Sequence, residues 1–287
     1  MTIWRGRYNR EFESRSLRNL VGAKDFSPLC SFKSLPTQNK TLNLNPKIVF
    51  LPLKIQVMKK SDFIVIAVIV LCLLPFFLFD SVYDAYCIAN QRFPLWMAFL
   101  KFGILATFGE MLGSRVKTGK YYHEGFGLAP KFVVWGLLGM WIALAMSVFR
   151  LGVPAFMERY AAFSGISAAM SGPMSWLKLL GAFCISTMMN TSFAPVFMTV
   201  HKISDMHIAE HGGAFSALFK PIEVKRLICE MDWGVQWGFV FKKTIPLFWI
   251  PAHTLTFCLP QDLQVLFAAF CGVVLGLLLS IAAMRKS

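Results

Sequence analysis

Charged residues are scarce in this chain. Asp, Glu, Lys and Arg make up only 15% of its 287 residues, whereas a typical soluble domain carries about 25%. Hydrophobic residues reach 56%, including 28 Phe, and the mean hydropathy is +0.57. A chain so poor in charge cannot cover a water-facing surface, so the composition excludes an ordinary soluble domain. It predicts an all-α, polytopic transmembrane helix bundle.

Motifs for catalysis and for tight metal binding are lacking as well. The chain contains no H-E-x-x-H, no G-x-S-x-G and no paired carboxylates with a plausible partner. Its seven cysteines are far apart and form no C-x-x-C pair, which predicts neither a disulfide framework nor a metal site. We therefore expect a protein that is not an enzyme, with no catalytic residues and no cofactor.

Long apolar runs are what the chain does have. The clearest is Phe132 to Phe149, eighteen residues without an ionisable side chain between Lys131 and Arg150. As a helix it would be about 27 Å long, close to the ~30 Å hydrocarbon core of a bilayer. Repeating this reading along the chain predicts about six spans. They are Phe63–Phe79, Leu95–Gly113, Phe132–Phe149, Leu177–Val200, Thr244–Leu259 and Leu263–Met284.

The net charge of +14 is distributed unevenly between the loops. With six spans, twelve basic residues fall on one side and four on the other, which favours membrane orientation over nucleic-acid binding. Both termini are then predicted to be cytoplasmic, in a bacterial inner membrane or, in a eukaryote, an organelle membrane. The twelve are Arg115, Lys117, Lys120, Lys131, Lys202, Lys220, Lys225, Arg226, Lys242, Lys243, Arg285 and Lys286; the four are Arg92, Arg150, Arg159 and Lys178.

Residues 1–57 form a basic extension, rich in Ser and Asn, before the membrane domain 58–287. Two interpretations are open. Arg- and Ser-rich composition is typical of an organellar transit peptide. Alternatively, Met58 is the native start, because Lys59, Lys60 and then an apolar run come directly after it.

Four polar residues within the predicted spans are candidates for lining a pore: Glu110, Asn190, His253 and Lys101. Ionisable groups are costly in a membrane and often mark a solute path. The alternatives are structural. Glu110 is near the end of its span, Lys101 can extend towards the interface, and Asn190 and His253 lie close to prolines whose helices have unpaired carbonyls.

Pairs of glycines four residues apart, Gly109 with Gly113 and Gly272 with Gly276, predict close helix packing and a face for homo-oligomers. After the fourth span, His201, Asp205, His207, Glu210 and His211 are close in sequence. His207 and His211 have a spacing that suits a metal on a helix, but we favour a solvated polar loop because spacing fixes no third ligand.

Several short motifs between Gly103 and Ser280 resemble the family of the 22-kilodalton peroxisomal membrane protein. They are Gly109-Glu110; Ala129-Pro130 with Trp135; Met189-Asn190 followed by Phe193-Ala194-Pro195; and Trp249 with Pro251, His253 and Phe257. The resemblance implies a small multi-span protein of peroxisomal or mitochondrial inner membranes, and some members of that family have been proposed as channels. The polar signature residues are replaced here, so this chain would be a divergent member.

Together these observations predict a multi-pass membrane protein whose partners are the lipid bilayer and a small solute. The leading hypothesis is a small-solute pore or channel-like protein. The alternative is a non-conducting membrane scaffold or assembly protein.

Overall fold

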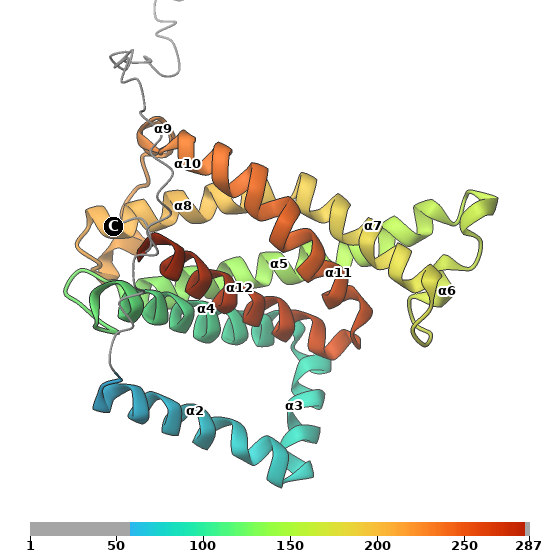
Figure 1. The fold of residues 1–287 in the computed structure, drawn as a ribbon, viewed down its shortest axis with the longest axis horizontal. Coiled ribbons are helices and arrows are strands. Elements are labelled where there is room, and N and C mark those ends of the chain that lie inside the picture. The colour runs from blue at the N-terminus through green and yellow to red at the C-terminus, as the bar shows by residue number, and fades with distance from the viewer. Residues whose placement is uncertain (1–57, 285–287) are drawn as a thin grey trace, which may run out of the picture.

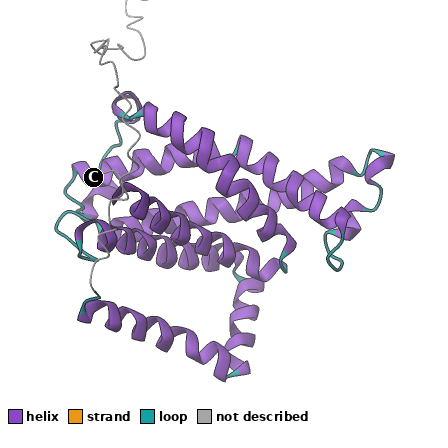
Figure 2. Ribbon diagram, in the orientation of Figure 1, coloured by secondary structure: helices purple, strands orange, loops and turns teal. Residues whose placement is uncertain are grey.

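The computed structural model describes residues 58–284, and every regular element among them is a helix (Figure 2). The all-α prediction is therefore confirmed for this part of the chain. The basic extension 1–57 and the choice between its two interpretations lie outside the described residues.

Three long helices lie side by side in the middle of the molecule: α4 (Pro94–Thr118), α5 (Leu128–Met157) and α12 (Gln261–Met284) (Figure 1). The closest packing joins α4 to α5 and α4 to α12. Helix α4 starts with Pro94, whose fixed φ suits a first helical position, and it ends at Gly119. Gly119 adopts φ 77° and donates its N–H to the Arg115 carbonyl, a common helix ending.

A second layer of helices packs against this group. It consists of α7 (Trp176–Ser192), α8 (Ala194–Glu210), η3 (Gln236–Trp249) and α11 (Ile250–Cys258), and α7 with α11 makes its most extensive contact. The two layers enclose one apolar core from α4, α5, α7, α11 and α12. Its buried members are Phe102, Met146, Ala182, Ile185, Met189, Phe257, Ala268 and Ala269.

Four of the described helices are long and apolar enough to cross a bilayer: α2 (Lys60–Leu78), α4, α5 and α12. A fifth results if α7 and α8, which meet at an angle of 47°, are taken as one span. They indicate a membrane-embedded protein. The predicted fourth span covers α7 and the first part of α8, and the predicted fifth, Thr244–Leu259, is divided between η3 and α11. The count of six stays a prediction.

Two prolines explain why the predicted fifth span consists of a π-helix followed by an α-helix. Helix η3 is wound in the wide π form, and Pro246 within it has no N–H to donate. Pro251 lies in the first turn of α11, where a missing N–H costs nothing. The predicted span is thus a joint between two short helices.

Helix α2 stands apart from the bundle and is joined to it by α3 (Asp80–Arg92) (Figure 1). None of its residues is buried. Its start is fixed to the end of α4, because Arg115 donates two hydrogen bonds to the carboxylate of Asp62, at 2.8 and 2.5 Å, and Tyr121 donates a third at 2.9 Å.

Short elements fill the connections. They are η1 (Ala161–Phe163) and α6 (Ile166–Ala169) between α5 and α7, and η2 (Phe215–Phe219), α9 (Val224–Glu230) and α10 (Trp233–Val235) between α8 and η3.

We name the two ends of the α4–α5 pair after residues of α4 and its loop. The Pro94 end contains the start of α4, Arg150 of α5 and the start of α12. The Gly119 end contains the loop 119–127 and the start of α5.

Candidate functional site: an ion cluster, a buried amide–imidazole pair and a cavity

Glu110 belongs to a cluster of polar side chains from three helices at the Gly119 end. Lys131 of α5 donates to Glu110 Oε2 and also to Asp205 Oδ1 of α8, the latter at 2.7 Å. Trp135 Nε1 donates to Glu110 Oε1 at 2.6 Å. His201 of α8 places Nε2 3.7 Å from the same oxygen, and its ring lies 4.3 Å from that of Trp135. We call these five residues the Glu110 cluster.

The charges of the Glu110 cluster do not cancel when His201 is neutral, since two carboxylates face one ammonium group. A bound cation would balance them. The side chains of Lys131 and Glu110 are 14% and 24% exposed, so water screens them less than it screens a surface ion pair. The cluster can therefore attract a cation as well as bind three helices together.

The loop 119–127 places Lys131 beside α8. Gly127 adopts φ 75° and packs so tightly that a Cβ there would lie 2.7 Å from Ile208 Cγ2 and 3.1 Å from Gly213 Cα. A glycine is needed both for this conformation and for this close approach. Helix α5 thus begins close to α8, which brings Lys131 within reach of Asp205.

Asn190 and His253 form a second, separate group inside the molecule. Asn190 Nδ2 donates to the Ser186 carbonyl at 2.9 Å and lies 3.0 Å from His253 Nδ1. Ser186 donates its hydroxyl to the Ile250 carbonyl at 2.7 Å. Asn190 and His253 are 1% and 8% exposed. Their interactions connect α7 to α11 beside the joint between η3 and α11. This arrangement fits a structural role, in which polar side chains hold two helices together near a proline.

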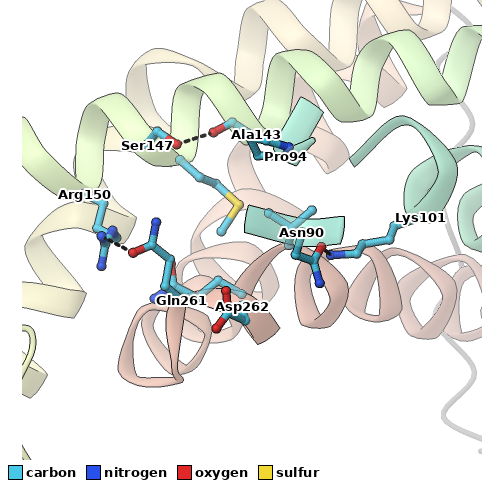
Figure 3. A pocket seen from close by; sticks show the side chains of 11 residues that line it. Asn90, Pro94, Lys101, Ala143, Ser147, Arg150, Gln261 and Asp262 are labelled. Atoms are coloured by element: carbon cyan, nitrogen blue, oxygen red, sulfur yellow. Dashed lines mark hydrogen bonds between the residues drawn. The ribbon is translucent and has the colours of Figure 1, made fainter. Parts of the chain in front are cut away.

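Lys101 lies at the Pro94 end, beside a cavity of about 100 Å³ (Figure 3). Its ammonium donates to Asn90 Oδ1 at 2.5 Å and sits 4.9 Å from the centre of the Tyr86 ring. On the other side of the cavity, Arg150 donates to Gln261 Oε1, and Asp262 lies beside Gln261. The Nδ2 atom of Asn90 is buried and has no hydrogen-bond partner.

The four candidate polar residues therefore occupy three different places. Lys101 and Glu110 share α4 but are nine residues apart, and at 3.6 residues per turn they point to opposite sides of the helix. Asn190 pairs with His253, but neither contacts the other two candidates through a hydrogen bond. Their pore-lining role stays a prediction.

Three of the four candidate glycines lie between α4 and α12. A Cβ at Gly109 would come 3.1 Å from Val273 Cα, and one at Gly113 would come 2.8 Å from Ser280 Oγ. A Cβ at Gly276 would lie 3.9 Å from the Gly109 carbonyl oxygen. By contrast, no atom outside its own helix lies within 4 Å of the Cβ position of Gly272. The first three glycines pack within this chain, and Gly272 faces outward.

The structure differs from the predicted polar loop after the fourth span. Residues 201–210 continue α8, and His207 is 4% exposed with its Nε2 2.9 Å from the Ala217 carbonyl. His201 and Asp205, four residues apart, occupy one side of this helix and face Glu110 and Lys131. In the described part of the chain, no group of three or more His, Cys, Asp and Glu is arranged to hold a metal ion.

Sequence reasoning missed Lys131, Trp135, His201 and Asp205 as partners of Glu110. In the sequence, Lys131 is assigned to the basic side as a loop charge, and the helical spacing that suits a metal is that of His207 and His211, not that of His201 and Asp205. An i, i+4 pair of polar residues directly after an apolar run was the available indication, because it places both on one helical face.

Comparisons with known proteins add no assignment: no family model, no curated protein and no solved structure matches this chain. The resemblance to the 22-kilodalton peroxisomal membrane protein family stays a prediction.

Proposed function

We propose that the protein is a channel-like membrane protein for small solutes, held closed by its apolar core. Charged side chains occur at both ends of the α4–α5 pair: the Glu110 cluster at the Gly119 end and Lys101, Arg150 and Asp262 around the cavity at the Pro94 end. Apolar side chains lie between them. This alternation of charge, apolar layer and charge supports the proposal, because hydrophobic constrictions can close a pore by excluding water.

Met146 is the residue at which to test the closed layer. It is 3% exposed, belongs to the apolar core and also lines the cavity. Met146→Ala would open space between the cavity and the core. We expect liposomes that contain this variant to release a trapped small solute faster than those with the unchanged protein.

Leu227→Ala is the matched control, because Leu227 is fully buried but belongs to a separate cluster with Ile203 and Met231. It should destabilise the protein to a similar degree without increasing the release. Liposomes that stay equally tight with Met146→Ala and with the unchanged protein would contradict the channel proposal.

Glu110→Gln tests the charged cluster at the Gly119 end. The amide can still accept the hydrogen bond from Trp135, but the negative charge is gone. We expect a weaker preference for cations over anions in the flux assay. Glu124→Gln is the control, since this carboxylate is exposed in the loop 119–127.

A second candidate, a non-conducting scaffold, is favoured by α2, which is apolar and contributes no buried residue. An apolar helix that packs poorly within its own chain is free to contact a second copy in the membrane. Light scattering in detergent would detect a homodimer, and Phe77→Ala, at a side chain that is 83% exposed, would weaken it. A monomer under all conditions, together with solute flux, would leave only the channel proposal.

A further inference from the structure

The cavity at the Pro94 end is surrounded by hydrogen-bond donors. Asn90 presents a buried Nδ2 without a partner, and its Oδ1 is already occupied by Lys101. The Lys101 ammonium has three N–H groups and the Arg150 guanidinium five, and each is seen to donate to only one amide oxygen around the cavity. A buried donor without an acceptor, Asn90 Nδ2, beside two half-buried cations indicates that a ligand rich in acceptors belongs there.

Two long helices also begin at this cavity. Pro94, the first residue of α4, and Gln261, the first residue of α12, both line it. The start of a helix carries a partial positive charge of about half an elementary unit and favours anions. Both helix starts thus add to the positive charge of Lys101 and Arg150.

Among the described residues, Asp262 is the one carboxylate that lines the cavity. It lies in the first turn of α12, a favourable position for an acidic residue, and it is exposed. With two cations and one carboxylate, the lining keeps one positive charge without a counter-ion. Asp262 would repel an incoming anion, which makes it a useful position for a test.

We propose that this cavity binds the phosphate group of a small ligand. Phosphate offers acceptor oxygens in several directions, and Asn90, Lys101 and Arg150 approach the cavity from α3, α4 and α5. The volume of about 100 Å³ is several times the ~10–15 Å³ needed for one water molecule, so a group of this size fits. The site does not depend on whether the protein conducts solutes.

Binding of radiolabelled orthophosphate to the purified full-length chain in detergent tests the proposal. Lys101→Gln and Arg150→Gln should each weaken binding about tenfold, the effect of losing a charge-assisted hydrogen bond. Asp262→Asn should tighten binding, because it removes a repulsive charge while leaving the donors in place. Because Asp262 is exposed, this variant keeps the test decisive even where a variant at Lys101 does not fold.

Arg159→Gln is the control, as Arg159 is an exposed cation in the connection after α5 and does not line the cavity. It should leave phosphate binding unchanged. Equal orthophosphate binding by all four variants and the unchanged protein would refute the site. Binding that Arg159→Gln weakens and Lys101→Gln leaves unchanged would refute it as well.

The phosphate group has two sources, and a second measurement separates them. The chain is reconstituted in vesicles of phosphatidylglycerol and phosphatidylcholine, extracted, and examined by native mass spectrometry for retained lipid. Retained phosphatidylglycerol that Lys101→Gln releases and orthophosphate displaces would identify a lipid headgroup. Orthophosphate binding without retained lipid would identify a soluble phosphate. The proposal is overturned if the chain neither binds orthophosphate nor retains phosphatidylglycerol.

Discussion

Helices α2 and α4 are both apolar enough to cross a membrane, yet they pack in opposite ways. The most apolar stretch of α2 has a mean hydropathy of 2.7, against 1.4 for α4. No residue of that stretch is buried in α2, whereas a third of the corresponding stretch is buried in α4. The more hydrophobic helix is therefore the less packed one. In a bilayer this is reasonable, because lipid chains are as apolar as Leu and burial against protein brings no hydrophobic gain.

Small residues account for the difference. Helix α4 buries Ala98, Gly103, Ala106, Gly109 and Gly113, which let α5 and α12 approach its backbone. Helix α2 contains no glycine and consists mainly of Ile, Val, Leu and Phe. Its fixed contact is the polar one between Asp62, Arg115 and Tyr121 at its start. Close packing thus depends on small residues and on polar contacts.

The largest effect is expected from a bulky residue at the α4–α5 contact. A Cβ at Gly139 would lie 2.4 Å from Phe102 Cβ, so Gly139→Leu should force the two helices apart. Overpacking of this kind costs about 3 kcal/mol. Thermal unfolding in detergent, followed by tryptophan fluorescence, should show a clear loss of stability.

Gly152→Leu is the control on the same helix, since no atom beyond the neighbouring backbone of its own helix lies within 4 Å of its Cβ position. It should leave the melting temperature nearly unchanged. Equal losses for both variants would show that helix propensity, and not the approach of α4, determines the effect.

A smaller and more local effect is expected where α2 is attached. Asp62→Asn removes the charge that receives two hydrogen bonds from Arg115. We expect α2 to move relative to α4, with little change in the melting of the bundle. Spin labels at Leu71 and Leu112 should give a broader distance distribution in this variant. Lys60→Gln is the control. An unchanged distribution in Asp62→Asn would show that other contacts, such as α3 and the hydrogen bond from Lys59 to the Gly119 carbonyl, are enough to position α2.

The smallest effect is expected within α2 itself. Leu71 is 71% exposed, so Leu71→Ala should change the unfolding free energy by less than about 0.5 kcal/mol. Ile185→Ala, at a fully buried side chain of the core, should cost about 2–4 kcal/mol by the same measurement. A large loss at Leu71 would mean that α2 is covered, and the comparison between α2 and α4 would fail.

Much of the architecture could be predicted from the apolar runs, but only part of the candidate site. The runs around Phe132–Phe149 and Leu263–Met284 correspond to α5 and α12, because in lipid a long apolar run satisfies its backbone hydrogen bonds as a helix. Glu110 was predictable as an unusual charge. Its partners were not, because Lys131, His201 and Asp205 come from helices whose relative positions the sequence does not state.

The sequence by itself determined that this is a membrane protein made of helices, since low charge and long apolar runs follow directly from composition. Only the tertiary structure decided that Glu110 meets Lys131 and His201, and that Asn90, Lys101 and Arg150 surround one cavity. The physical reason is that a helix fixes neighbours three or four residues apart, whereas neighbours from different helices depend on how those helices pack.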